Sequence, residues 1–209
     1  MYLKYCGFTR EKDIQVACHL NIDAIGIITY PKSKRYVERD KLVQLFENVP
    51  SYIDRVAVTV NTPIEALLNL VQTSNINVLQ LHGNESVETV KALKTSCPSI
   101  KIFKAIPAHN DCIQQVKTFA PLVDKILVDT PTALFGGSGE TFDWKVLSEC
   151  TETPILVAGG LNNHNVKTLI KHYPHIEGLD VSSGIERAKG IKDSRKMAQF
   201  IDTVKGALK

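Results

Sequence analysis

Short apolar runs recur along the chain, and most of them end at a glycine, a proline or a polar residue. Runs of this length without alternating polar positions are typical of parallel strands that are buried on both faces. We predict eight such strands. They cover residues 3–6, 24–28, 56–60, 78–81, 102–105, 126–128, 155–158 and 178–181.

Segments with apolar residues at helical spacing follow the strands. Three of them begin with a helix-start signal: Thr62 before Pro63, Ser86, and Asp193. These residue types accept hydrogen bonds from the first free N–H groups of a helix, and proline suits the first helical position. The predicted helical segments are residues 10–20, 38–48, 64–73, 87–95, 112–119, 144–150, 166–172 and 194–208.

The alternation of eight strands with eight helices predicts the fold class. Strands separated by helices form a parallel sheet with right-handed crossovers, and eight such units suffice to close it. We therefore predict an α/β fold, a single (β/α)8 TIM barrel formed by one domain over residues 1–209. An open doubly wound sheet is the alternative, but no Gly-x-Gly-x-x-Gly motif follows the first strand.

Composition limits the function classes. The 209 residues are 44% hydrophobic and 22% charged, as in an ordinary globular domain. The net charge of +3 without a Lys/Arg block predicts no nucleic-acid partner and no membrane surface, and it suits an anionic small molecule. No targeting segment or membrane-spanning stretch is recognisable, and the five scattered cysteines read as reduced thiols of a cytoplasmic protein.

Two reactive side chains lie where predicted strands end. Cys6 closes the first strand and Asp129 follows the sixth. In a barrel, both would project into the mouth, where a thiolate can remove a proton and a carboxylic acid can donate one. An isolated cysteine is more often a small buried hydrophobe, whereas an aspartate directly after an apolar strand must be solvated or used.

Two glycine-containing loops predict a phosphate site. Gly159 and Gly160 follow the seventh strand, and Ser182, Ser183 and Gly184 follow the eighth. Barrels commonly bind phosphate there through backbone N–H groups and a short extra helix, for which residues 185–187 are the candidate.

Three further polar residues are candidates for substrate binding. Arg35 lies in the loop after the second strand and could form a bidentate pair with a carboxylate, although a loop arginine is often only a surface charge. Gln80 and His82 flank Leu81, so they share one face of the fourth strand. No metal-binding histidine motif occurs, and we predict no metal.

The Gly-rich segment at residues 135–144 follows the sixth strand but lacks the Gly-Lys-Ser/Thr ending of a P-loop. We predict either a mobile loop over the barrel mouth or a plain flexible connector, with Thr141 or Asp143 capping the next helix.

Lys4 and Asp180 are predicted to form an ion pair beneath the site. Each lies two residues before a strand-end residue, so both face inward, and barrel closure makes the first and eighth strands neighbours. Two charges inside a packed barrel are tolerable only as a pair.

Six segments, taken in order, closely resemble the phosphoribosylanthranilate isomerases of tryptophan biosynthesis. The resemblance runs from Lys4 to about Asp193, and six motifs in the family's order are highly specific. The segments are residues 4–9, 30–37, 79–83, 128–130 with 136–144, 158–162 and 180–186.

The resemblance implies a monomeric, cofactor-free barrel that isomerises N-(5-phosphoribosyl)anthranilate by an Amadori rearrangement. It makes Cys6 the general base, Asp129 the general acid and Arg35 the group that holds the anthranilate. The two glycine loops match the family's phosphate site. Two alternatives stay open: an epimerase-like phosphosugar barrel, which usually needs metal-binding histidines, and a noncatalytic phosphometabolite-binding barrel.

Overall fold

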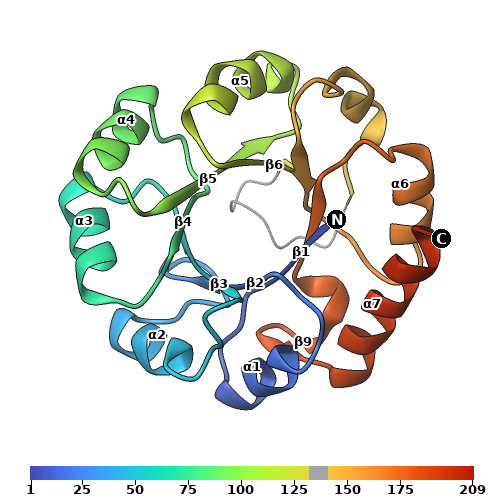
Figure 1. Ribbon diagram of the computed structural model, residues 1–209, viewed down its shortest axis with the longest axis horizontal. Coiled ribbons are helices and arrows are strands. Elements are labelled where there is room, and N and C mark those ends of the chain that lie inside the picture. Colours follow the sequence, from blue (N-terminus) through green and yellow to red (C-terminus); the bar gives the residue numbers. More distant parts are fainter. Residues whose placement is uncertain (132–140) are drawn as a thin grey trace.

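The computed structural model describes residues 1–131 and 141–209. Its eight parallel strands pair in sequence order, and β8 pairs with β1, so the sheet closes into a barrel (Figure 1). The strands are β1 (Tyr2–Cys6), β2 (Ala24–Ile28), β3 (Asp54–Thr59), β4 (Val78–Leu81), β5 (Lys101–Pro107), β6 (Lys125–Asp129), β7 (Ile155–Val157) and β8 (Gly178–Val181).

Helices surround the barrel (Figure 1), and the predicted (β/α)8 TIM barrel is confirmed. The α-helices are α1 (Glu11–Cys18), α2 (Arg39–Phe46), α3 (Ile64–Thr73), α4 (Val87–Ser96), α5 (Cys112–Phe119), α6 (Val166–His172) and α7 (Ser194–Ala207). The described residues also form the short 3-10 helices η1 (Ala120–Leu122), η2 (Trp144–Glu149) and η3 (Ser183–Ile185).

The side chains of the strands form two buried layers because successive residues point to opposite faces. The larger layer lies between the strands and the helices; for example, Tyr5 donates a hydrogen bond to the Met197 carbonyl of α7 (2.7 Å) and packs edge-on against Phe200. The smaller layer fills the barrel and includes Cys6, Val56, Val78, Ala105 and Leu127.

The predicted helix starts are confirmed at two of three places. Ser86 accepts from the Thr89 N–H, and Asp193 accepts from the N–H groups of Arg195 and Lys196. The prediction at Thr62 was wrong by one residue, because Pro63 is the N-cap of α3 and no side chain caps it.

Two other local predictions need correction. The segment after Asp143 is a 3-10 helix, although Asp143 caps it as predicted by accepting from the Lys145 N–H. The predicted extra helix at residues 185–187 is wrong: η3 ends at Ile185, and the chain then forms a hairpin of β9 (Glu186–Ala188) and β10 (Ile191–Lys192). Gly190, at a φ of +77°, supplies the left-handed turn between the two strands. The predicted mobile loop lies mostly outside the described residues.

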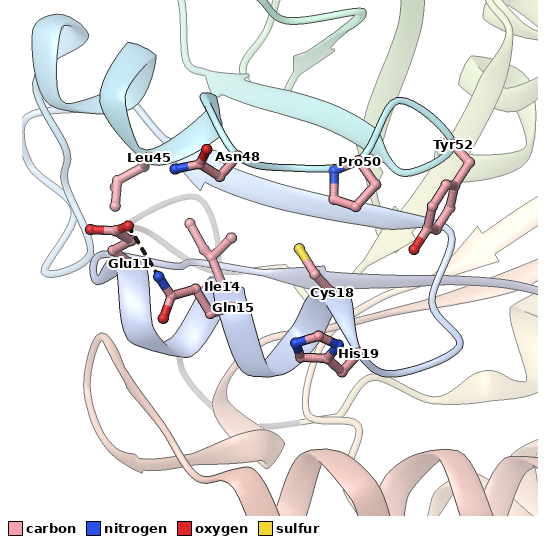
Figure 2. Close-up of a pocket in the computed structure, with 9 residues that line it drawn as sticks. All are labelled: Glu11, Ile14, Gln15, Cys18, His19, Leu45, Asn48, Pro50 and Tyr52. Atoms are coloured by element: carbon pink, nitrogen blue, oxygen red, sulfur yellow. Dashed lines mark hydrogen bonds between the residues drawn. The ribbon is translucent and has the colours of Figure 1, made fainter.

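A cavity of about 210 Å³ lies on the outside of the barrel between α1 and the chain leading into β3 (Figure 2). Cys18, His19 and Tyr52 are among the residues that line it. None of the site residues predicted from the sequence contributes to this cavity. Among the described residues, no helix has the length and apolar character needed to cross a membrane.

Candidate active site

The strand alternation directs four of the predicted site residues into the barrel. Gln80 and Asp129 lie two positions after the interior residues Val78 and Leu127, and Cys6 itself belongs to the interior layer. Asp180 is buried on β8, opposite Lys4 in the strand register. Polar groups therefore replace apolar ones at the carboxyl ends of these strands, where barrel enzymes carry their active sites.

The predicted ion pair between Lys4 and Asp180 is confirmed. Lys4 Nζ lies 2.8 Å from Asp180 Oδ2, and the lysine is fully buried. Burial alone would lower the pKa of Lys4, but the Asp180 carboxylate and the Cys6 side chain reverse this and raise it. Asp180 Oδ1 is buried without a hydrogen-bond partner among the described residues, so one carboxylate oxygen can still accept from a ligand.

Cys6 lies beside this pair, and Gly26 makes room for it. A Cβ at position 26 would lie 2.7 Å from Cys6 Sγ and 3.0 Å from Lys4 Nζ. Burial raises the pKa of the Cys6 thiol above its usual value, and the nearby ammonium of Lys4 opposes that rise. Because the Asp180 carboxylate balances the charge of Lys4, the ammonium only partly offsets the rise in the thiol pKa.

A chain of hydrogen bonds connects Gln80, His82 and Asp129. Gln80 Nε2 lies 2.9 Å from His82 Nδ1, which confirms the predicted shared face, and His82 Nε2 lies 3.0 Å from Asp129 Oδ2. An amide NH₂ can only donate, so Nδ1 accepts and Nε2 carries the proton that His82 donates to Asp129. The Thr130 N–H donates to the other oxygen, Oδ1, at 2.7 Å. Asp129 is therefore held at both oxygens.

The two glycine loops lie side by side. A Cβ at Gly184 would collide with the Leu161 carbonyl oxygen, so the loop after β8 packs directly on the loop after β7. Gly159 and Gly160 have φ values of +82° and +62°, which glycine adopts without strain. Ser182 Oγ is buried and has no hydrogen-bond partner in the described part of the chain. Ser183 begins η3 in the same loop.

Arg35 is buried rather than solvated, and the carboxylate that it contacts was not predicted. Its Nε and Nη2 donate to the two oxygens of Glu186 at 2.8 and 2.7 Å, and this raises the pKa of Arg35. Sequence reasoning missed Glu186 because residues 185–187 read as a helix. A usable signal was the pair of charged residues, Glu186 and Lys192, on either side of the glycine at position 190.

Removal of the Lys4 charge should destabilise the fold strongly. Lys4→Met leaves the Asp180 carboxylate buried and unpaired, which typically costs about 3 to 5 kcal/mol. The free energy of unfolding from urea titration measures the loss. Lys101→Met, which removes an exposed partner of Asp54, should cost about 1 kcal/mol or less. Equal losses in the two variants would contradict the buried-pair interpretation.

The fold and the candidate site together define a (β/α)8-barrel enzyme with a thiol, a carboxyl group and two adjacent glycine loops at one end of the barrel. The family model for N-(5'-phosphoribosyl)anthranilate isomerase matches residues 3–203, and the chain belongs to this family.

Individual relatives agree with this assignment. An N-(5'-phosphoribosyl)anthranilate isomerase from Staphylococcus aureus is 40% identical over 206 residues, which cover 99% of this chain and 98% of that protein. The crystal structure of phosphoribosyl anthranilate isomerase from Thermotoga maritima superposes with a TM-score of 0.88 at 32% identity, covering 99% of both chains. A second isomerase structure, solved with reduced 1-(o-carboxyphenylamino)-1-deoxyribulose 5-phosphate, gives a TM-score of 0.85 at 29% identity, also covering 99% of both chains.

Proposed function

We propose that this chain converts N-(5-phosphoribosyl)anthranilate to 1-(2-carboxyphenylamino)-1-deoxyribulose 5-phosphate in tryptophan biosynthesis, by an acid/base Amadori rearrangement without a cofactor. The observation that carries the proposal is the combination of Cys6 and Asp129 at inward-facing strand ends with the paired glycine loops. Family membership supplies the reaction, and these residues supply the groups that it needs.

The substrate phosphate is assigned to the loops after β7 and β8. Gly159, Gly160 and Gly184 permit close approach of backbone N–H groups to phosphate oxygens, and Ser182 Oγ and Ser183 add hydroxyl donors. The partner is therefore a phosphorylated small molecule. Gln80 and His82 form a hydrogen-bonded chain that ends at Asp129, which places them next to the bound sugar. Asp180 Oδ1 accepts a hydrogen bond from a sugar hydroxyl.

Asp129 acts as the general acid in the first step. It donates a proton to the ribose ring oxygen, the C–O bond breaks, and the ring opens to a protonated Schiff base with the aniline nitrogen. His82 lies 3.0 Å away, and its Nε2–H orients the Asp129 carboxyl group by donating to Oδ2. The buried setting, with Asp129 only 8% exposed, keeps bulk water from competing for that proton.

Cys6 acts as the general base in the second step. Its thiolate removes the proton from the sugar carbon next to the Schiff base, which gives an enolamine that tautomerises to the ketone. The ammonium of Lys4 lies near Sγ and stabilises the thiolate. A base with a raised pKa is rarer in its thiolate form but accepts the carbon-bound proton more strongly.

The raised pKa of Cys6 predicts an alkaline-shifted rate profile. The free enzyme gains the required thiolate as pH rises, and the thiol pKa lies above the ordinary value of about 8.5. In Asp129→Asn, in which no carboxylic acid has to stay protonated, we therefore expect the residual kcat/KM to rise continuously from pH 6.5 to at least pH 8.5. A steady-state pH profile measures this, and a plateau reached below pH 7.5 would contradict it.

The direct test is an assay of the purified chain for loss of phosphoribosylanthranilate fluorescence, with and without a chelator. Loss of fluorescence that the chelator does not affect supports the proposal. Activity that disappears with the chelator would point to a metal-dependent, epimerase-like barrel. Binding of the phosphorylated ligand without turnover would point to a noncatalytic binding barrel.

We further infer that the chain works as a monomer in the cytoplasm. The five cysteines are free thiols, as a reducing compartment favours. Within the described residues only five large apolar side chains are exposed, Met1, Val16, Tyr36, Tyr52 and Leu208, and they are scattered along the sequence. The isomerase from Thermotoga maritima is described as dimeric.

A further inference from the structure

The hairpin of β9 and β10 places two buried charges beside the barrel mouth. Glu186 and Lys192 are opposite each other in the strand register, and their side chains are 5% and 0% exposed. The hairpin also connects to α1, because the Lys192 N–H donates to Asp13 Oδ2 at 3.1 Å. Figure 1 shows β9 next to α1. The hairpin is an addition to the eight repeating units of strand and helix.

Glu186 occupies one edge of the Arg35 guanidinium. Its two oxygens accept from Nε and Nη2, so the contact is bidentate and fixes the plane of the guanidinium. A guanidinium has five N–H donors, and this contact uses two of them. The remaining three lie on Nη1 and Nη2, and along that edge Arg35 donates no hydrogen bond to another described residue, so the edge can receive a second carboxylate.

The other contacts of Arg35 place it between the proposed base and the phosphate loops. Gly7 directly follows Cys6, and a Cβ there would lie 2.6 Å from Arg35 Cδ and 2.7 Å from Ser182 Oγ. The arginine stem therefore lies against the backbone between β1 and the loop after β8. Gly7 has a φ of +77°, so glycine suits both the space and the backbone conformation at this position.

Lys192 contacts the end of β1, the loop after β8 and Glu186. Its Nζ donates to the Cys6 carbonyl at 2.5 Å, to the Ser182 carbonyl at 3.1 Å and to Glu186 Oε1 at 3.0 Å. Three acceptors match the three N–H donors of an ammonium group, and Glu186 favours this charged form against burial, which lowers the pKa of Lys192. The position of the Glu186 carboxylate is therefore tied to the backbone at the ends of β1 and β8.

We propose that Glu186 is a positioning residue for the reaction: it holds Arg35 so that the second guanidinium edge binds the aromatic carboxylate of the substrate. The inference rests on the proposed function, in which Arg35 binds that carboxylate. Lys192 anchors Glu186 to the strand that carries Cys6. Two cations and one anion leave the cluster with one positive charge, which suits an anionic ligand.

The charge on Glu186 is required for this role. Burial by itself would raise the pKa of Glu186, but the hydrogen bonds and charges of Arg35 and Lys192 lower it below its ordinary value. Glutamine has nearly the same shape, but its NH₂ group would replace one of the oxygens that accept from Arg35 and Lys192. Two donors would then face each other, and that hydrogen bond would be lost. Glu186→Gln should therefore release Arg35 without creating a cavity.

The test compares two probes: reduced 1-(2-carboxyphenylamino)-1-deoxyribulose 5-phosphate and the same compound without its carboxyl group. Calorimetry gives the Kd of each. We expect wild type to prefer the carboxylated probe by about tenfold or more, as a charged bidentate contact implies. Glu186→Gln should remove most of this preference, raise KM for the substrate about tenfold and change kcat less than threefold.

Two further variants sharpen the test. Arg35→Lys should reduce the preference by itself, because an ammonium cannot form a bidentate contact. The double variant Arg35→Lys/Glu186→Gln should lose little more of the preference than either single variant, since both changes remove the same contact with the carboxylate. Asp54→Asn is the matched control: it makes the same carboxylate-to-amide change at the start of β3, where Asp54 accepts from the Tyr2 hydroxyl, and should leave the preference unchanged.

The outcomes separate this inference from the proposed function. If Glu186→Gln weakened the binding of both probes equally, Glu186 would have a merely structural role. That result would overturn this inference but leave the proposed function standing. A wild-type enzyme with no preference for the carboxylated probe would refute the carboxylate contact of Arg35 and the inference with it. If Glu186→Gln does not fold, Glu186→Asp keeps the charge balance, shortens the side chain and should still reduce the preference.

Discussion

Replacing Cys6 by serine should abolish nearly all turnover while leaving the fold intact. The hydroxyl of serine keeps the shape of the thiol but is far too weakly acidic to supply a base near neutral pH. Loss of a general base typically costs a factor of about 10² to 10⁴ in rate. We therefore expect kcat of Cys6→Ser to fall by at least a hundredfold in the fluorescence assay.

Three controls make that result specific to the base. Cys18→Ser makes the same substitution in α1, beside the outer cavity of Figure 2, and should leave kcat within about twofold of wild type. The Cys6→Ser protein should still bind the reduced product analogue, because the loops proposed to bind the phosphate are unchanged. Its urea midpoint should shift little. Near-wild-type turnover in Cys6→Ser would remove Cys6 from the mechanism.

The barrel and the positions of the candidate site residues could be predicted from the sequence because parallel strands leave a simple pattern. Each strand is a short apolar run, and a polar residue at its carboxyl end stands out against that run, as Cys6 and Asp129 do. The period of two then places Lys4 below Cys6 and opposite Asp180. Such predictions need only local pattern and barrel closure.

The contacts of Arg35 could not be read in the same way. Glu186 is 151 residues away along the chain, and no strand period connects the loop after β2 to the hairpin. The hairpin was not predicted because residues 185–187 lie where barrels often have an extra helix. The raised pKa of Cys6 could not be predicted either, since it depends on burial and on Asp180 balancing the charge of Lys4.

Replacing Asp129 by asparagine should produce the second large loss of activity. Asparagine keeps one carbonyl oxygen that can accept from the Thr130 N–H, as Oδ1 of Asp129 does at 2.7 Å, but it cannot donate a proton to the ring oxygen. Ring opening then has no acid. We expect kcat to fall by about 10² to 10⁴, while the Kd of the reduced product analogue stays within about threefold of wild type.

The split between kcat and affinity decides what Asp129 does. His82→Gln keeps a hydrogen-bond donor near Asp129 but removes the imidazole, so it should lower kcat by less than Asp129→Asn does. The double variant should be no slower than Asp129→Asn alone, because His82 acts only through Asp129. Weaker binding of the product analogue with an unchanged kcat in Asp129→Asn would instead make Asp129 a binding residue, and the general acid would have to be sought elsewhere at the barrel mouth.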